Sequence, residues 1–444
     1  MHRNIMTSLI LITGLVIHAG AFARPPADAS IDLTGNLNCP VITADGGTAF
    51  LQVALTTGSV RMTDRRPMNI AVVLDRSGSM GSQGKIEYAR TALHRLLDQL
   101  TGSDILSLVV YDDVVDVMRP AARVRNKREI ATMIDRIMPR NSTNLGGGMM
   151  EGFRQAARYA GTEYVNRVIL LSDGLANTGM TDPAALNAIA RRYRSQAISL
   201  TSMGVGLEYN ENLMVGLSES GGGNYYFIES PNTLAAIMRK ELTTVSAVVA
   251  QNALLEVGLG KGVEIRDVIG AEYTSCDGVV SIPLGDLYGS DRRDLTLELV
   301  IPPGRGTLEV ARGVLRSDDR RSPGRSPSFT ASVRYTRDVA EMERHRDQEA
   351  QSKVDVARST RKVDEAMKAL DEGRDKDAER VLGDARQILS ASPAATAGGA
   401  AAEAVYDQMN TITGYEDTLR ANREDLRRAK KAIQYDNYQV QKRR

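Results

Sequence analysis

A regular alternation of two kinds of segment between Asn69 and Ala250 constrains this chain more than any other feature. Short runs of β-branched and aliphatic residues alternate there with segments whose apolar residues recur at spacings of three and four, which is typical of strands alternating with helices. Such a pattern builds a mostly parallel sheet with helices on both faces. The sequence therefore predicts a doubly wound α/β domain at residues 66–250. We expect its strands at NIAVVLD, ILSLVVYDD, RVILLSDG, AISLTSMGVG and NYYFIES, with VVDVM as a short antiparallel edge strand.

On both sides of this domain the hydrophobic period changes to two. FLQVALTTGSVRM before it, and six segments after it, alternate apolar and polar residues between Gly, Pro, Asn and Asp. One strand or hairpin cannot bury its apolar face alone, whereas six or more strands can close as a sandwich. We expect residues 24–65 and 251–337 to form one antiparallel β-sandwich into which the α/β domain is inserted. A chain of 444 residues is too long for one hydrophobic core, so we expect two or three domains of about 100 to 200 residues.

The remaining residues, 338–444, are rich in Ala, Glu, Arg, Lys and Gln, so helices are expected. A helical hairpin is predicted around Gly373, which ends its first helix. The hairpin resembles one tetratricopeptide-like unit, and the alternative is a helical bundle with a solvated charged face. SPAATAGGAAAEA predicts a flexible joint, and residues 403–444 predict one further helix with a basic tail. These C-terminal helices are a candidate surface for an additional partner.

The first residues have the form of an export signal. Arg3 precedes an apolar run from about Ile5 to Ile17, and small residues follow that end in AFA. This pattern predicts a cleavable signal peptide at residues 1–23, with a mature start near Arg24. The alternative is an uncleaved membrane anchor, for which the apolar run is short. We therefore expect an exported protein, either periplasmic or at the cell surface.

The two cysteines of the chain are Cys39 and Cys276. Each lies in a β-patterned flank, and an exported chain meets an oxidising compartment in which cysteines can pair. We expect a disulfide between them that ties the two flanks together inside the sandwich. The alternative is two unpaired thiols, because the sequence does not give their separation.

The charge balance argues against a polyanion as the main partner. Lys and Arg number 56, and Asp and Glu number 55. No strong overall field therefore attracts a polyanion. We expect neither nucleic acid nor an anionic membrane as the main partner.

The segment VVLDRSGSMGSQGK places short oxygen-bearing side chains directly after a buried strand. In an open α/β sheet, ligands bind at the carboxyl ends of the strands, where this loop is expected to lie. Asp75, Ser77 and Ser79 offer three oxygen ligands at alternate positions, and hard oxygen ligands suit Mg²⁺. Three are too few to hold the ion, so other loops at the same edge must contribute. RNSTNLGGGMM supplies Thr143 ahead of a helix, and VILLSDG supplies Asp173 after a strand.

The ordered set DxSGS, STNLGGG and LSDG on one alternating α/β segment resembles the von Willebrand factor type A domain with a complete metal-ion-dependent adhesion site. The resemblance covers well under half of the chain, and NRVILLSDGLANTG is also similar to bacterial members of the family. It implies that Ser77, Ser79 and Thr143 offer hydroxyl oxygens to the metal. It also implies that Asp75 and Asp173 act directly or through bound water. The metal implied is Mg²⁺, with Mn²⁺ or Ca²⁺ as alternatives.

A site of this type leaves at least one coordination position for water or an incoming oxygen. The resemblance therefore implies a protein partner whose Asp or Glu completes the coordination shell. We predict an exported, non-enzymatic, metal-dependent adhesion or assembly protein. The rival prediction is a structural scaffold whose metal only stabilises the fold and whose C-terminal helices make the contacts. Such domains also serve as partners of chelatase-like motor ATPases. Those ATPases are intracellular, so the predicted signal peptide argues against this role.

Enzymatic activity is not expected, and no catalytic residue is predicted. His94 and His345 fall on predicted helices without a matched nucleophile or metal-ligand neighbour, and the other two histidines lie in the predicted signal. No P-loop, Ser-His-Asp arrangement or zinc spacing is recognisable. A metal-assisted hydrolase with Asp75 or Asp173 as base is a weaker alternative, because neither a second metal set nor a dedicated acid is evident.

Two features of these loops leave alternatives open. Arg76, inside the first motif, either faces a partner and steers its acidic groups or is solvated. Gly146 to Gly148 either allow the Thr143 loop a close approach or form a plain helix-entry turn.

Overall fold

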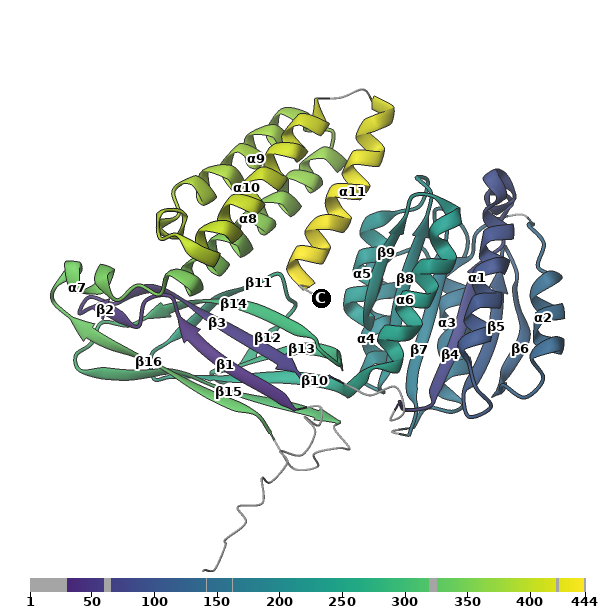
Figure 1. Cartoon of the computed structure of the whole chain (residues 1–444), viewed down its shortest axis with the longest axis horizontal. Coiled ribbons are helices and arrows are strands. Elements are labelled where there is room, and N and C mark those ends of the chain that lie inside the picture. Colours follow the sequence, from purple (N-terminus) through teal and green to yellow (C-terminus); the bar gives the residue numbers. More distant parts are fainter. Residues whose placement is uncertain are drawn as a thin grey trace, which may run out of the picture.

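The computed structural model describes residues 30–59, 65–140, 142–161, 163–318, 326–420 and 423–442. Three parts lie against one another: an α/β domain, a β-sandwich and a group of C-terminal helices that lies beside both (Figure 1). The predicted signal peptide, residues 1–23, lies outside the described residues. The predicted fold class is confirmed: a doubly wound sheet is inserted in a β-sandwich, and helices follow.

The α/β domain is built on a six-stranded sheet with the order β6-β5-β4-β7-β8-β9. Neighbouring strands are parallel except β6, which runs antiparallel to β5 at the edge, as predicted. Every residue of β4, β5, β7 and β8 is buried, because helices cover both faces, and most residues of these strands are accordingly apolar. The strands are β4 (Met68–Asp75), β5 (Ile105–Tyr111), β6 (Val115–Arg123), β7 (Val165–Ser172), β8 (Ile198–Val205) and β9 (Gly222–Ile228).

The helices of this domain enclose two apolar cores, one on each face of the sheet. The first core is covered by α1 (Lys85–Gln99), α2 (Lys127–Asp135) and α6 (Leu234–Ser246). The second is covered by α3 (Leu145–Ala157), α4 (Pro183–Arg194) and α5 (Glu211–Gly221). Helices α2 to α5 each begin after an Asn or Asp whose side chain accepts a backbone N–H of the first turn, which explains where they start.

The β-sandwich consists of two sheets around a separate apolar core. The strand orders are β1-β3-β14-β11 and β12-β13-β10-β15-β16-β2. All pairs are antiparallel except β16 with β2, which are parallel at one edge. The strands are β1 (Ile31–Leu37), β2 (Val41–Thr43), β3 (Gly47–Thr57), β10 (Val248–Leu259), β11 (Glu264–Ile269), β12 (Thr274–Cys276), β13 (Val279–Tyr288), β14 (Arg292–Ile301), β15 (Thr307–Asp318) and β16 (Ser328–Thr336).

The two connections between the sandwich and the α/β domain are held by one turn, between β13 and β14. The backbone N–H of Ser290 donates to the carbonyl of Gly58 on the incoming connection, at 3.0 Å. The backbone N–H of Gly289 donates to the carbonyl of Ala247 on the outgoing connection, at 2.7 Å. Both ends of the inserted domain are thus anchored at the same place.

The predicted disulfide is absent, because Cys39 and Cys276 are both free thiols. Cys276 ends β12, at one edge of the six-stranded sheet of the sandwich. Cys39 lies just before β2, at the other edge of the same sheet. At roughly 4.8 Å per strand, opposite edges of such a sheet lie more than about 20 Å apart. A disulfide needs its Cα atoms within about 7 Å. Cys39 is buried, and its sulfur lies 3.3 Å from Nη1 of Arg346 instead.

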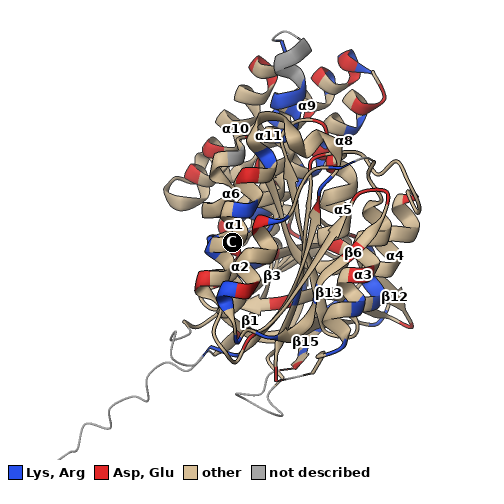
Figure 2. Cartoon of the chain, turned by 90° about the vertical axis from the view of Figure 1, so that its right-hand side faces the viewer, with Lys and Arg blue, Asp and Glu red and all other residues tan. Residues whose placement is uncertain are grey.

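The C-terminal helices are α7 (Val339–Arg344), α8 (Gln348–Asp371), α9 (Asp375–Ser390), α10 (Gly399–Leu419) and α11 (Arg423–Lys442). The predicted hairpin is formed by α8 and α9, and Gly373, with a φ of 70°, ends its first helix. Acidic and basic residues are interspersed on these helices (Figure 2). No helix within the described segments is long and apolar enough to span a bilayer.

Two predictions for this region are wrong. Residues 403–444 were expected to form one helix, but the described part of this range contains two: α10, which packs on α8 and α9, and α11, which also reaches the α/β domain. The segment expected to be a flexible joint contains a 3₁₀ turn, Pro393–Thr396, with Ala394 buried and Ser392 as its cap.

A buried arginine joins the α/β domain to the sandwich. Arg167 in β7 has no exposed surface, and its Nη2 lies 2.9 Å from Oδ2 of Asp286 and 2.8 Å from the hydroxyl of Tyr288, both in β13. Its Nη1 lies 3.9 Å from Oε1 of Glu241 in α6. A buried charge is costly unless partners surround it, so these contacts fix the α/β domain against the sandwich.

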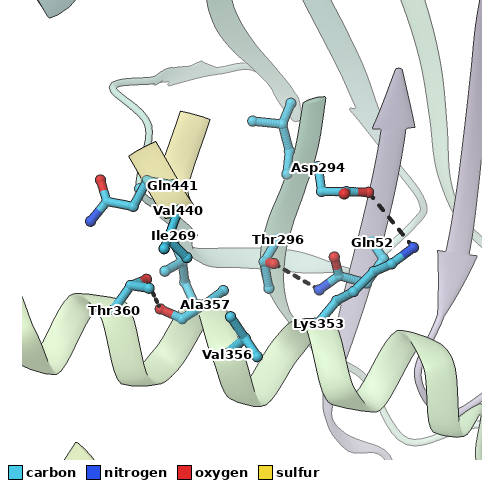
Figure 3. Close-up of a pocket in the computed structure, with 12 residues that line it drawn as sticks. Gln52, Ile269, Asp294, Thr296, Lys353, Val356, Ala357, Thr360, Val440 and Gln441 are labelled. Atoms are coloured by element: carbon cyan, nitrogen blue, oxygen red, sulfur yellow. Dashed lines mark hydrogen bonds and ion pairs between the residues drawn. The ribbon is translucent and has the colours of Figure 1, made fainter. Parts of the chain in front are cut away.

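A small cavity lies where the C-terminal helices meet the sandwich (Figure 3). Gln52 and Thr296 on the sheet form a 2.7 Å hydrogen bond there, and Nζ of Lys353 in α8 lies 3.7 Å from the carboxylate of Asp294. The volume of about 50 Å³ suits about one or two water molecules rather than a ligand. This seam is therefore a packing feature.

Candidate metal centre

Three loops meet at the carboxyl edge of the parallel sheet. Strand β4 ends at Asp75, and its parallel neighbour β7 ends at Ser172, directly before Asp173. The third loop carries Thr143 just ahead of α3. Because β4 and β7 pair in register, the residues that follow them lie side by side. The predicted site residues therefore come from the loops that the sequence indicated.

Asp75 lies at the base of the site and is fully buried. Its Oδ1 accepts the backbone N–H of Ser77 at 2.8 Å, and its Oδ2 accepts the hydroxyls of Ser172 at 2.8 Å and Tyr111 at 3.4 Å. Burial raises the pKa of Asp75 to about 6, and the nearby Asp173 carboxylate contributes to this rise, while hydrogen bonds from Ser77 and Ser172 oppose it. A carboxylate in such surroundings is stabilised by an adjacent cation.

The two serines and Asp173 form a connected set. The hydroxyl oxygens of Ser77 and Ser79 lie 3.1 Å apart, and the Ser79 hydroxyl donates to Oδ1 of Asp173 at 2.8 Å. Ser79 lies in a stretch of 3₁₀ turns, Gly78–Gly84, which separates β4 from α1. Ser77 and Asp173 are buried, whereas Ser79 is exposed. The set therefore has a buried and a solvent-facing side.

Thr143 lies at the same place and is held by the loop that follows Asp173. Its backbone N–H donates to Oδ1 of Asn177 at 3.0 Å, and its carbonyl accepts the N–H of Asn177 at 3.2 Å. A Cβ atom added at Gly174 would lie 3.6 Å from the Thr143 hydroxyl oxygen and 3.8 Å from that of Ser79. One small volume thus borders both hydroxyls, and the structure brings all five predicted residues together.

The glycines that follow Thr143 permit close packing. A Cβ atom at Gly146 would lie 2.5 Å from the carbonyl oxygen of Met180, and one at Gly148 would lie 2.5 Å from the ring of Tyr111. Both distances are shorter than any van der Waals contact. Gly146 and Gly148 therefore allow a close approach between α3 and its neighbours, whereas Gly147 adjoins the helix cap Asn144, so each alternative holds for part of this segment.

Lys85 is a further residue of this site that was not predicted from the sequence. Its Nζ lies 2.6 Å from Oδ2 of Asp173, and only 7% of its side chain is exposed. The signal available in the sequence is that Lys85 follows the glycine-rich motif directly. A lysine at the start of an amphipathic helix is usually solvated, so this signal is weak.

Arg76 neither faces a partner nor is solvated, so both alternatives considered for it are wrong. It is 7% exposed, and its Nε lies 2.8 Å from Oδ2 of Asp112. Its Nη2 also pairs with Asp116. Nε of Arg140, which is half-exposed, lies 3.1 Å from the same Asp112 oxygen. The guanidinium of Arg76 therefore binds the β5–β6 turn to the motif loop.

The donor set fits a hard divalent cation. Two carboxylates and three hydroxyls converge, all with oxygen donors, as Mg²⁺ prefers. Among the described residues, no group of three or more His, Cys, Asp or Glu side chains is arranged to hold a metal ion. A cation at this edge would therefore depend on the hydroxyls of Ser77, Ser79 and Thr143 as well as on the carboxylates.

Comparison with known proteins agrees with this geometry. Residues 69–240 match the sequence profile of the von Willebrand factor type A domain. This segment is a von Willebrand factor type A domain. Domains of this type commonly bind a divalent metal and typically serve protein interaction or adhesion. The profile covers the strands from the second residue of β4 to the end of β9, and all the residues of the candidate metal centre.

Relatives share this domain at low identity. Uncharacterized protein YfbK of Escherichia coli is 28% identical over 55% of this chain and 44% of its own length. Uncharacterized protein sll0103 of Synechocystis is 26% identical over 61% of this chain and 66% of its own length. The inter-alpha-trypsin inhibitor heavy chain H3 of Mesocricetus auratus is 28% identical over 43% of this chain and 23% of its own length. The chain thus spans less than two thirds of each of these relatives.

Two solved structures share the fold over most of the chain. The von Willebrand factor type A protein from Catenulispora acidiphila superposes with a TM-score of 0.72 at 17% identity, covering 93% of this chain and 97% of that one. The ArnB paralog VWA2 from Sulfolobus acidocaldarius superposes with a TM-score of 0.57 at 17% identity, covering 92% and 99%. At these identities the likeness extends to the fold alone.

Proposed function

We propose that this protein is a non-enzymatic binding module that captures an acidic side chain of a protein partner through a divalent cation. The observation that carries the proposal is the convergence of Asp75, Ser77, Ser79, Thr143 and Asp173 at the carboxyl edge of the type A domain. Mg²⁺ is the cation that this donor set suits best, with Mn²⁺ and Ca²⁺ as alternatives.

Residues of this site would hold the cation from two sides. Asp75 is fixed by Ser172 and Tyr111 at its buried side, so it would hold the cation from below. The hydroxyls of Ser79 and Thr143 would hold it from the loops. A bound divalent cation would supply positive charge and an exchangeable ligand position, which a carboxylate oxygen from a partner fills.

The surface around this site suits a protein partner. Nine large apolar side chains are exposed in the described part of the chain, and five of them lie on the loops or first helical turn at this edge. Exposed apolar side chains that gather in one place mark protein-binding surfaces. The partner we propose therefore presents Asp or Glu beside apolar residues. The five side chains are Tyr88, Val114, Met138, Leu175 and Met180.

Calorimetric titration of Mg²⁺ and Mn²⁺ into the metal-stripped protein tests the site. Saturable binding should occur in the parent and disappear in Asp75→Ala and Asp173→Ala. Asp135→Ala removes an exposed carboxylate on α2 and should leave binding unchanged. Equal binding in the parent and both site variants would contradict the proposal.

Selection of displayed peptides in Mn²⁺, followed by elution with EDTA, tests the partner chemistry. The selected peptides should carry Asp or Glu beside apolar residues and should not bind Thr143→Ala. Thr132→Ala, an exposed threonine on α2, is the matched control and should bind them as the parent does. Peptides without an acidic residue that bind Thr143→Ala equally well would argue against carboxylate capture.

A scaffold role is the second candidate, because the C-terminal helices form part of the surface near the site. A cleft of about 580 Å³ lies between the type A domain and these helices, and Leu175, Glu208, Leu370 and Arg427 are among its lining residues. If the helices make the contacts, Tyr406→Ser on the exposed face of α10 should reduce partner binding and Thr143→Ala should not. The reverse result supports metal-dependent capture.

We further propose that the protein acts after export, in the periplasm or at the cell surface. The proposal is supported by the apolar run and small residues of positions 1–23. A fusion of residues 1–40 to a reporter that folds only outside the cytoplasm should be active. A reporter that is active only in the cytoplasm would contradict export.

A further inference from the structure

We propose that Lys85 is a built-in positive charge of the metal centre, which lowers the affinity of the empty site for cations and raises the affinity of the loaded site for carboxylates. This inference rests on the proposed function, because it concerns the same site. It adds a residue that determines which charge the loaded site presents to a partner.

The geometry holds the Lys85 ammonium against Asp173. Nζ of Lys85 lies 2.6 Å from Oδ2 of Asp173, and the other oxygen, Oδ1, accepts the Ser79 hydroxyl at 2.8 Å. Both oxygens of this carboxylate are therefore engaged. Only one of them faces the hydroxyls of the motif, so Asp173 would offer a cation Oδ1 while Lys85 keeps Oδ2.

The main chain of the motif itself positions Lys85. The backbone N–H of Lys85 contacts the carbonyls of Met80 and Ser82, at the start of α1. Gly206, with a φ of 77°, borders the other side, and a Cβ atom there would lie 3.5 Å from Cε and 3.7 Å from Nζ of Lys85. The N–H of Gly206 is bonded to the carbonyl of Ile228 at 2.8 Å, so this wall is fixed. The ammonium therefore occupies a built position rather than a solvated one.

The charge balance gives the consequence. Asp75 and Asp173 carry two formal negative charges, and Lys85 cancels one of them. A divalent cation then leaves the site with a net charge of plus one, whereas the same site without Lys85 would be neutral. Lys85 therefore repels the incoming cation, and it attracts the carboxylate that follows. In a partly buried site this effect is poorly screened.

Titration of Mn²⁺ into the full chain and its variants tests the first half of the inference. Lys85→Met and Lys85→Gln should bind Mn²⁺ about tenfold more tightly than the parent, because one buried like charge is removed. Lys85→Gln keeps a hydrogen-bond donor near Asp173, so it reports on charge even if Lys85→Met fails to fold. Lys353→Met, which removes a largely buried paired lysine in the helix–sandwich seam, should bind as the parent does.

Acetate added to the Mn²⁺-saturated proteins tests the second half. Its binding displaces metal-bound water, which lowers the water-proton relaxation rate. The variants at position 85 should need several-fold more acetate than the parent for the same decrease, because their loaded site is neutral. Equal acetate dependence in the parent and Lys85→Gln would overturn this half.

The outcomes separate this inference from the proposed function. If the parent binds Mn²⁺ and Lys85→Gln binds it equally or more weakly, the inference is wrong and the proposed function stands. If neither binds Mn²⁺, both are wrong. If only the variants at position 85 bind it, Lys85 blocks the cation in the parent, which supports the first half of the inference and overturns metal loading of the parent.

Discussion

The backbone N–H of Tyr225 donates a hydrogen bond to the hydroxyl of Tyr438, 3.2 Å away, although the two residues are separated by most of the second half of the chain. Tyr225 lies in β9, the outer strand of the parallel sheet, and Tyr438 lies near the end of α11. Their rings meet edge to face, with centroids 5.8 Å apart. The last helix thus satisfies a backbone group that an edge strand would otherwise leave unpaired.

Substitution Tyr438→Phe should therefore destabilise the protein. The ring and its packing stay, but the buried N–H of Tyr225 loses its acceptor, which costs about 1–3 kcal/mol of unfolding free energy. Urea denaturation followed by far-UV circular dichroism measures the difference. Tyr406→Phe, on the exposed face of α10, should change stability by less than about 0.5 kcal/mol. Equal effects of the two substitutions would show that the hydroxyl of Tyr438 contributes nothing.

A larger loss is expected from Arg167→Met. The substitution leaves the carboxylate of Asp286 buried without its guanidinium partner and removes the nearby charge that faces Glu241. Removing one partner of a buried ion pair lowers the free energy of unfolding by about 3–5 kcal/mol. The same denaturation experiment applies, with Arg312→Met as the control, because Arg312 pairs with Glu309 at an exposed position. A loss no larger than that of the control would mean that water replaces the guanidinium in this network.

Much of this architecture can be predicted from the spacing of apolar residues along the chain, which is a property of each short segment by itself. Runs such as NIAVVLD and the alternating SFTASVRYT identify buried and half-buried strands without any knowledge of their neighbours. The motif residues Asp75, Thr143 and Asp173 were predictable for the same reason, since each follows or precedes a recognisable element at one edge of the sheet.

Strand order and long-range pairing were not predictable in this way. Whether Cys39 and Cys276 lie together depends on the order of six strands, and the order that forms puts them at opposite edges. Whether the side chains of Lys85 and Arg76 are solvated or form buried ion pairs depends on whether a carboxylate from another segment lies close to them. Local pattern gives no information on either point.

The attachment of α11 to the type A domain should weaken in acid. Burial raises the pKa of Glu211, but hydrogen bonds from Lys430 and Lys431 outweigh it, and the pKa is held below its usual range. A depressed pKa means that the stabilisation is present above the unfolded value, about 4.3, and is lost as the pH falls through the lower folded value. Melting temperatures measured between pH 7 and pH 3 should fall more steeply for the parent than for Glu211→Gln. Parallel curves would show that this ion pair does not support the contact.

Two glycine substitutions should act in opposite directions. In Gly148→Ala the new methyl group would lie 2.5 Å from the ring of Tyr111, whose hydroxyl bonds Asp75, so overpacking should cost about 1–3 kcal/mol and weaken metal binding as well. In Gly383→Ala, within α9, the methyl group meets nothing within 4 Å. That change should stabilise the protein by about 0.5–1 kcal/mol, because alanine has the lower backbone entropy in the unfolded chain. Thermal unfolding and Mn²⁺ titration of both variants measure these effects. Unchanged metal affinity in a destabilised Gly148→Ala would separate the packing of Tyr111 from the positioning of Asp75.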